Sequence, residues 1–314
     1  MTDTMSYLRV SLLRGCNMRC FYCRPAGADA DMVDAPVERR RFEAAIKVLH
    51  LTGVRKVRFT GGEPTLYKDM IRLASFTRNL DEGIHVAMTT NGVRLSKLAE
   101  QLGSAGVNSI NISLDSLRRD RFHRITARDW LNNVLGGIEA AIKHIPVVKL
   151  NCVMMRGIND DEAGSMIAFA NDLGVTIRFI EFMPSRTTGA IKRWYVSGDE
   201  IRERVGYSFL PVGVDPTSAA RYYRSGDLDI LVGFINPVSH PFCANCNRLR
   251  LASDGKLYGC LFSDRAIDLF EALDAGREQA LRKIADLVES KRFQGCSGAI
   301  RAGEALPSFV GIGG

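Results

Sequence analysis

The chain has 314 residues, 46% of them hydrophobic, so it can bury the core of a large α/β domain and is not of the disordered class. With 42 basic and 35 acidic residues its formal net charge is +7, which favours an anionic partner but also suits an ordinary solvated surface. Its apolar runs are too short to span a bilayer and its first ten residues lack a signal-peptide core, so a cytoplasmic protein is expected.

Between residues 7 and 184, short β-branched runs alternate with longer stretches of helical periodicity. Strands are expected at 7–13, 54–60, 84–90, 107–114, 147–154 and 175–182. Helices are expected at 37–52, 67–80, 94–103, 130–144 and 161–172, and three of them are followed by Gly53, Gly106 and Gly174 as left-handed caps. The alternation predicts parallel strands joined by right-handed crossovers, as an open sheet or a partial (βα)6 TIM-type barrel.

Beyond about residue 185 the pattern changes to short strands separated by turn residues, within 207–215, 220–225 and 228–236. Two helices follow near 264–274 and 277–291, and the tail from Gly295 is rich in Gly and Ala. We therefore predict a barrel over 1–190 and a C-terminal α+β extension over 191–314 that closes the barrel.

Unusual motifs stand at the C-terminal ends of five predicted strands. They are RGCNMRC (14–20), TGGEP (60–64), TTNG (89–92), SLDS (113–116) and EFMPS (181–185). The active sites of barrels and of open parallel sheets are built at this end of the strands. The sequence therefore predicts that these motifs share one active site.

Three cysteines of the first motif region, Cys16, Cys20 and Cys23, have the spacing CxxxCxxC. Clustered thiols in a reducing compartment are more often metal ligands or catalytic groups than disulfides. Three thiolates can hold a [4Fe–4S] cluster and leave one iron open to another ligand. The alternatives are a zinc ion with a distant fourth ligand, although this loop holds no histidine, and structural thiols unrelated to one another.

A second group, Cys243, Cys246 and Cys260, consists of a CxxC pair and a third thiol after thirteen intervening residues. Its spacing suits a zinc site, with His240 nearby, as well as a [4Fe–4S] cluster that again lacks one protein ligand. Of the two remaining cysteines, Cys152 is expected to be a buried strand thiol, and Cys296 has no assigned role.

The CxxxCxxC motif, followed in order by TGGEP, SLDS and EFMPS, resembles the radical S-adenosylmethionine (SAM) superfamily. With CxxCNRLR, a further cysteine and a terminal Gly-Gly, nearly the whole chain resembles the GTP 3′,8-cyclase family of molybdenum cofactor biosynthesis. The resemblance implies two [4Fe–4S] clusters, with SAM on the first open iron and the guanine of GTP on the second. It also implies the chemistry: a 5′-deoxyadenosyl radical takes the ribose 3′ hydrogen, the ribose carbon attacks C8 of guanine, and reduction gives 3′,8-cyclo-7,8-dihydro-GTP.

Individual residues match functional positions of these families. The metal ligands would be Cys16, Cys20, Cys23, Cys243, Cys246 and Cys260. The SAM-binding positions match Tyr22, Gly61, Gly62, Ser113, Asp115 and Met183. The GTP-binding positions match Arg9, Lys56, Arg58, Thr89, Lys149, Arg248, Leu249 and Arg250. Catalytic roles fall to Arg9, Arg248, Arg250 and the terminal Gly313 and Gly314.

The residues themselves support part of this assignment. Arg9, Arg58 and Lys149 lie within otherwise apolar strands, and a buried cation needs a partner. A triphosphate in the barrel would be that partner, and the alternative is internal pairing with the carboxylates Glu63, Asp115 or Glu181.

The expected partners are GTP, an external flavodoxin- or ferredoxin-like electron donor and a second copy of the chain in a homodimer, with neither nucleic acid nor a membrane. Two other functions stay open. One is a two-cluster radical SAM enzyme acting on another nucleotide or on a peptide, and the other is a non-enzymatic iron–sulfur or zinc protein that binds nucleic acid. The strand-end motifs and the lack of interleaved aromatic and basic residues count against the second.

Overall fold

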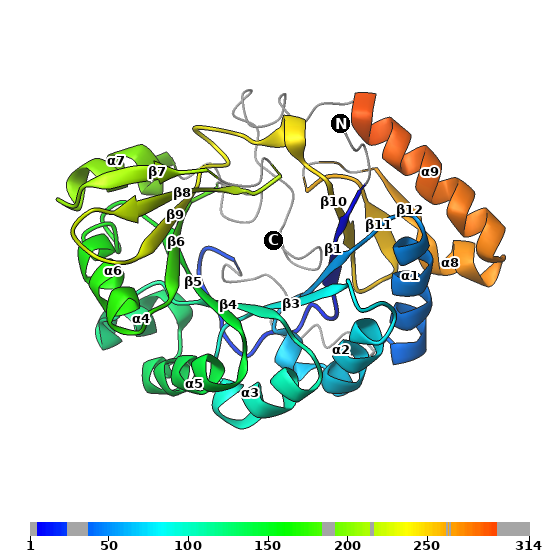
Figure 1. Cartoon of the computed structure of the whole chain (residues 1–314), viewed down its shortest axis with the longest axis horizontal. Coiled ribbons are helices and arrows are strands. Elements are labelled where there is room, and N and C mark those ends of the chain that lie inside the picture. The colour runs from blue at the N-terminus through cyan, green and yellow to red at the C-terminus, as the bar shows by residue number, and fades with distance from the viewer. Residues whose placement is uncertain are drawn as a thin grey trace.

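The structure is a computed structural model and describes residues 5–23, 37–183, 192–213, 217–261, 263 and 265–293. Within these residues a single sheet of twelve strands curves around the centre of the molecule, and helices cover its outer face (Figure 1). The strand order is β12-β11-β10-β1-β2-β3-β4-β5-β6-β9-β8-β7.

Six parallel strands in chain order form the predicted partial barrel, which confirms the fold class. They are β1 (Tyr7–Ser11), β2 (Lys56–Thr60), β3 (His85–Thr90), β4 (Ser109–Ser113), β5 (Val147–Met154) and β6 (Thr176–Glu181). The chain returns between them through α1 (Arg39–Leu51), α2 (Met70–Arg78), α3 (Leu95–Ser104), α5 (Leu131–His144) and α6 (Ala163–Asp172). Sequence analysis missed one helix of this region, α4 (Arg119–Thr126), and the short turn η1 (Pro64–Leu66). The glycines predicted as caps, at 53, 106 and 174, all have positive φ.

The residues after 191 extend both edges of the barrel sheet. At one edge β9 (Leu231–Ile235) runs parallel to β6, and β8 (Ala220–Ser225) and β7 (Phe209–Val212) continue the sheet in antiparallel order. At the other edge β10 (Arg248–Leu251) runs parallel to β1, followed by β11 (Lys256–Tyr258) and β12 (Ala266–Asp268). The helical elements here are η2 (Lys192–Trp194), α7 (Gly198–Arg204), η3 (Cys243–Asn245), α8 (Leu269–Asp274) and α9 (Arg277–Phe293). The extension is thus part of the barrel's own sheet, and the division at 190/191 stays a prediction.

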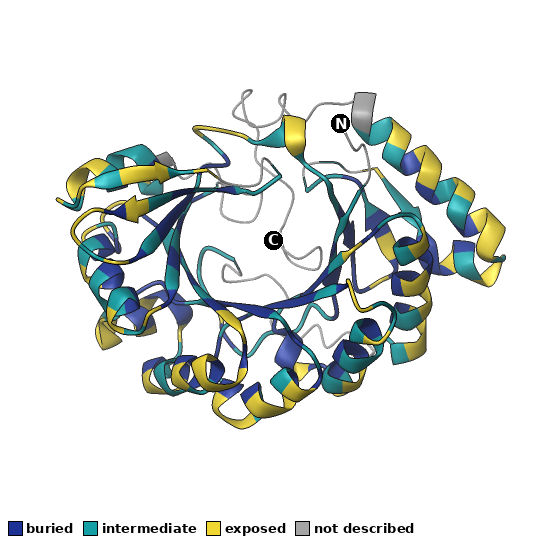
Figure 2. Ribbon diagram, viewed as in Figure 1, coloured by how far each residue is buried: buried dark blue, intermediate teal, exposed yellow. Residues whose placement is uncertain are grey.

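The hydrophobic core lies between the sheet and the helices, and Figure 2 shows buried strands surrounded by helices whose outer faces are exposed. On β1 and β2, Leu8, Val10, Val57 and Phe59 are fully buried in this core. Successive strand residues point to opposite faces, so the residues between them point to the inside of the barrel. Among the described helices, none is long and apolar enough to cross a membrane.

Candidate functional site

Strand register places basic residues side by side on the inner face of the barrel. The cross-strand partners in two successive rows are Lys56, Tyr7 and Arg248, then Arg58, Arg9 and Arg250. Leu249 lies between the two arginines of β10 on the opposite face, where it is fully buried in the core. Its side chain therefore faces away from the inside of the barrel, and only its backbone can reach a ligand there.

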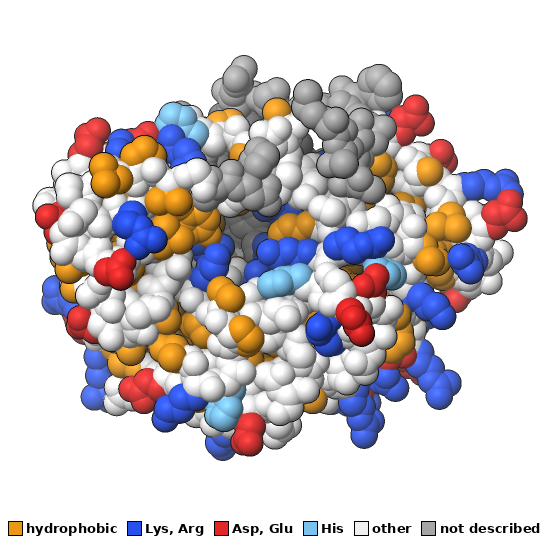
Figure 3. All heavy atoms as spheres, in the orientation of Figure 1, with side chains coloured by type: hydrophobic (Ala, Val, Ile, Leu, Met, Phe, Trp, Pro, Cys, Tyr) orange, Lys and Arg blue, Asp and Glu red, His pale blue; other side chains and the backbone are white. Residues whose placement is uncertain are grey.

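These rows line a cavity of about 860 Å³, within the range of small-molecule sites. Its lysines and arginines are Arg9, Lys56, Arg58, Lys149, Arg178, Arg248 and Arg250. The described residues that line it include neither Asp nor Glu. Figure 3 shows Lys and Arg side chains gathered at the hollow in the middle of this face. The cavity therefore suits a polyanion of nucleotide size.

An anion in the cavity would stabilise two arginines whose pKa is lowered and would accept hydrogen bonds from a third. Burial lowers the pKa of Arg9 to about 10, and burial together with the neighbouring cations Arg9 and Arg248 lowers the pKa of Arg250 to about 9. Within the described part of the chain, Nε and Nη2 of Arg248 are buried and have no hydrogen-bond partner. Two unused guanidinium nitrogens in a cavity are the arrangement that a phosphate oxygen pair satisfies.

Tyr7 is a site residue that sequence analysis missed. Its hydroxyl oxygen accepts a hydrogen bond of 2.7 Å from Nε of Arg58, and the ammonium of Lys56 lies 5.2 Å from its ring centre. Burial on its own raises the pKa of Tyr7, but the combined field of Arg58, Arg9, Lys56 and Arg248 lowers that pKa to about 7. The cations around Tyr7 therefore favour the ionised form of its phenol.

The far wall of the cavity adds a second group of polar contacts. Arg178 donates from Nε and Nη2 to Oδ1 of Asn151 at 2.9 and 2.7 Å, and Nζ of Lys149 lies 3.4 Å from the hydroxyl of Tyr222. Neither Arg178 nor Asn151 was predicted, although Arg178 interrupts an apolar strand in the same way as Arg58. Thr89, a predicted GTP contact, accepts a 3.3 Å hydrogen bond from Nη1 of Arg58.

The three carboxylates considered as internal partners of the cations bond to neutral donors instead. Glu63 accepts hydrogen bonds from the hydroxyls of Thr65 and Thr90 and from backbone N of Asn91. Asp115 accepts from the hydroxyl of Tyr22 and from backbone N of Val153. Glu181 accepts from the hydroxyl of Ser239 and from backbone N of Gly198 and Val238. In the described part of the chain, these hydrogen bonds of the three carboxylates are thus made to neutral groups and not to the cavity cations.

Backbone hydrogen bonds hold the start of the first cysteine loop, which carries Cys16, Cys20 and Cys23, against the end of β2. Backbone N of Gly62 donates to the carbonyl of Leu13 at 2.7 Å, and backbone N of Glu63 donates to that of Gly15 at 2.9 Å. A Cβ on Gly62 would lie 2.0 Å from the carbonyl oxygen of Gly15, and one on Gly61 would lie 2.6 Å from that of Leu13. This close packing gives both glycines a structural reason, beside the approach to SAM that the resemblance implies.

The opposite side of the loop rests on the end of α4, where backbone N of Phe21 donates to the carbonyl of Ile125 at 3.1 Å. Burial, followed by the charges of Asp115, Cys23 and Cys16, raises the pKa of the Cys20 thiol, so these groups lie near one another. The hydroxyl of Tyr22 donates to Asp115 at 2.7 Å. Two predicted SAM residues therefore meet beside the three predicted cluster ligands.

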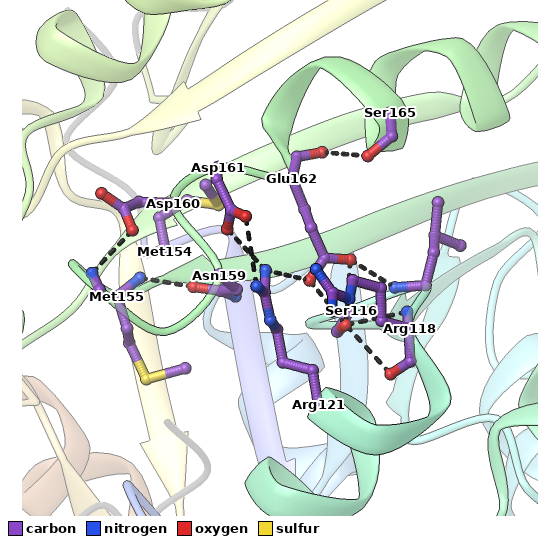
Figure 4. A network of polar contacts seen from close by, with 12 residues as sticks. Ser116, Arg118, Arg121, Met154, Met155, Asn159, Asp160, Asp161, Glu162 and Ser165 are labelled. Atoms are coloured by element: carbon purple, nitrogen blue, oxygen red, sulfur yellow. Dashed lines mark hydrogen bonds and ion pairs between the residues drawn. The ribbon is translucent and has the colours of Figure 1, made fainter.

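A buried polar network fixes the end of β4 that carries Asp115 (Figure 4). Ser116 Oγ and Arg121 Nη1 donate to Glu162 at 2.8 and 2.6 Å, and Glu162 is only 4% exposed. Asn159 Nδ2 donates to the carbonyl of Asp115 at 2.7 Å. Asn159 and Glu162, which lie just before α6, thus fix the position of the loop that follows β4.

The second cysteine group opens onto the cation-lined cavity, because Cys243, Cys246 and Cys260 all line it. In the residues that the structure describes, no three Cys, His, Asp or Glu side chains converge closely enough to hold one metal ion. A zinc site needs its thiolates about 2.3 Å from a single centre, whereas the thiolates of a cubane bind different irons. Each group offers three cysteine thiols, which is the protein ligand set of a [4Fe–4S] cluster that keeps one iron open.

Comparison with known proteins gives the family. The Radical SAM superfamily profile matches residues 10–170, and the profile called Molybdenum Cofactor Synthesis C matches residues 175–295. A GTP 3′,8-cyclase of Clostridium botulinum (strain Langeland) is 37% identical over 293 residues, which cover 92% of this chain and 91% of the relative. The chain belongs to the GTP 3′,8-cyclase family.

Further relatives agree with this family. A GTP 3′,8-cyclase of Thermodesulfovibrio yellowstonii is 39% identical over 87% of this chain and 86% of its own length. Molybdenum cofactor biosynthesis protein 1 of Drosophila melanogaster is 36% identical over 94% of this chain and 54% of its own length. The crystal structure of Streptococcus suis SuiB bound to S-adenosylmethionine has a TM-score of 0.69 at 15% identity, covers 96% of this chain and 68% of that chain, and shows the fold alone.

Membership of the GTP 3′,8-cyclase family confirms several predictions. The cofactors of the family are SAM and two [4Fe–4S] clusters, as predicted, and not zinc. The chain is an enzyme of the radical SAM type, so the non-enzymatic alternative is wrong. The predicted tail residues Gly313 and Gly314, and Cys296, lie outside the described residues.

Proposed function

We propose that this chain converts GTP to 3′,8-cyclo-7,8-dihydro-GTP for molybdenum cofactor biosynthesis. The observation that carries the proposal is the cavity lined by cations and open to the second cysteine group. Met183, a predicted SAM contact, also lines it, so one cavity connects the predicted SAM site to the second cysteine group.

In this proposal each cysteine group holds one cluster: Cys16, Cys20 and Cys23 the first, and Cys243, Cys246 and Cys260 the second. When bound, the first cluster and SAM supply the 5′-deoxyadenosyl radical that removes the ribose 3′ hydrogen. Tyr22 and Asp115, which bond to each other beside the first group, would orient SAM. The protein's own contribution is to place the ribose within reach and to exclude water from the radical.

The triphosphate would bind along the two basic rows of β1, β2 and β10. Arg248 would donate from Nε and Nη2, Arg9 and Arg250 would face the phosphates, and Lys149 and Arg178 would close the far wall. GTP bound in this way would lie in the same cavity as the cysteines of the second group, within reach of their cluster. We also propose that the enzyme works in the cytoplasm as a homodimer and takes electrons from a flavodoxin- or ferredoxin-like donor. The Gly313-Gly314 tail would take part in catalysis.

The test is anaerobic reconstitution, followed by incubation with SAM, a reductant and GTP, with ATP in a parallel reaction. We expect about eight irons per chain, as two [4Fe–4S] clusters require, SAM cleavage stimulated by GTP, and a cyclised purine detected by mass spectrometry. Arg178→Met should weaken GTP binding, whereas Arg119→Met, which removes an exposed cation on α4, should not. SAM cleavage that ignores GTP, with no cyclised product, would overturn the substrate and favour another nucleotide or a peptide.

A further inference from the structure

Lys291 lies on the buried face of α9, at a position where the helical pattern predicts an apolar residue. Ala280, Ile284 and Leu287 form the buried face of this helix, at spacings of four and three residues. Lys291 is the next position on the same face, four residues further on, and it is partly buried. A charged group on such a face is unfavourable unless it has polar or charged partners.

Lys291 contacts the second cysteine group and the strand that follows Cys246, and its Nζ also lies 3.5 Å from Sδ of Met5. Its Nζ lies 3.7 Å from Sγ of Cys246 and donates a 2.6 Å hydrogen bond to the carbonyl of Arg248, the first residue of β10. Its side-chain stem passes Gly259, where a Cβ would be 3.4 Å from the Cβ and 3.6 Å from the Cδ of Lys291. Gly259 directly precedes Cys260, so one side chain touches both cysteine segments and the strand between them.

We propose that Lys291 is part of the second cluster site, where its ammonium group raises the reduction potential of the bound cluster. The inference rests on the proposed function, since it takes Cys246 as a cluster ligand. Reduction potentials of iron–sulfur clusters depend on net charge and on hydrogen bonds to the sulfurs. Reduction makes the cluster more negative, so a cation against one thiolate stabilises the reduced form more than the oxidised form.

The same contacts also suit a purely structural role, in which Lys291 only ties α9 to β10. The two roles differ in what they need. A tether needs a hydrogen-bond donor of the right length, and its loss lowers stability without changing the redox properties of the cluster. Tuning needs the positive charge, so arginine should replace lysine and methionine should not.

The test isolates the second cluster in a full-length parent in which Cys16, Cys20 and Cys23 are alanine. Iron counting comes first, and about four irons per chain are expected. Electron paramagnetic resonance of the reduced cluster at controlled potentials then gives the midpoint potential in the parent, Lys291→Met, Lys291→Arg and Arg282→Met. The last variant removes a cation from the exposed side of α9, where Arg282 pairs only with Glu278 among the described residues.

We expect a more negative midpoint in Lys291→Met and midpoints close to the parent in the other two variants. If Lys291→Met fails to take up iron while Lys291→Arg does, Lys291 serves to assemble the site and not to tune it, and the inference is overturned. A loaded Lys291→Met with the parent's midpoint overturns it, as does failure of both Lys291 variants to load. A parent that binds no iron overturns the proposed function instead, because the second cysteine group would then hold no cluster.

Discussion

Replacing Gly62 by alanine should release the first cysteine loop from the barrel. The added Cβ would lie 2.0 Å from the carbonyl oxygen of Gly15 and 2.4 Å from that of Arg14, whereas real Cβ atoms essentially never come closer than 3.0 Å. The loop must therefore retreat by at least 1.0 Å (3.0 − 2.0), and both obstructing atoms belong to the backbone.

This retreat lengthens the two hydrogen bonds that hold the loop, from Gly62 to Leu13 and from Glu63 to Gly15. Overpacking typically costs about 1–3 kcal/mol, and each lost hydrogen bond costs about 1 kcal/mol. Together they destabilise the native position of the loop by about 3–5 kcal/mol, which is enough to displace it in most molecules.

Iron counting after anaerobic reconstitution measures the effect. The wild type should carry about eight irons per chain and Gly62→Ala about four, since only the first cluster depends on this loop. Urea unfolding of the metal-free protein should show a lower midpoint for Gly62→Ala. Gly164→Ala is the matched control, because a Cβ at that position on α6 meets no atom within 4 Å. Full iron and an unchanged urea midpoint in Gly62→Ala would refute the packing argument.

Three further outcomes follow from contacts described by the structure. Gly136→Ala should stabilise the metal-free protein by up to about 1 kcal/mol, because a Cβ at this helical position meets no atom within 4 Å. Gly137→Ala should destabilise it by about 1–3 kcal/mol, because a Cβ there would lie 2.2 Å from the backbone oxygen of Gly92. Urea unfolding of both variants measures the two free-energy changes. Arg121→Met leaves buried Glu162 without its cation and should cost about 3–5 kcal/mol in the same assay, and a loss below 1 kcal/mol would contradict it. Because the surrounding cations lower the pKa of Tyr7 to about 7, the metal-free protein without GTP should gain phenolate absorbance as the pH rises through 7, and Tyr7→Phe should abolish that step. The stability contributed by this ionisation grows above pH 7 and is lost as the pH falls through it.

Local patterns were sufficient to predict six parallel strands in chain order, with an open sheet and a partial barrel as alternatives. The β-branched runs at 54–60 and 147–154 became β2 and β5, because a strand buried on one face and packed beside its neighbours in chain order needs only short-range information. The strand-end motifs predicted the site for a related reason: parallel strands bring their C-terminal ends to one edge, so Tyr22 meets Asp115 across 93 residues.

Contacts set by long-range pairing were not predicted. The sequence Arg-Leu-Arg-Leu of β10 alternates as a strand does, but its parallel partner β1 is more than 200 residues away, and nothing local indicates that pairing. Tyr7 looks like an ordinary strand aromatic until β2 and β10 bring Lys56 and Arg248 to its two sides. Arg178 was the exception, since a cation within an apolar strand was already the signal that identified Arg58.

The pairing of β10 with β1 also determines when the sheet can be completed during synthesis of the chain. β1 ends at Ser11 and β10 begins at Arg248, so 237 residues (248 − 11) must leave the ribosome before β1 gains its second neighbour. At roughly 5–20 residues per second, synthesis of this stretch takes about 12–47 seconds. During that time one edge of β1 is exposed, and the far edge of β6 waits for β9. A nascent chain cut off near residue 190 would therefore carry two open sheet edges, and we expect it to need chaperones or to aggregate.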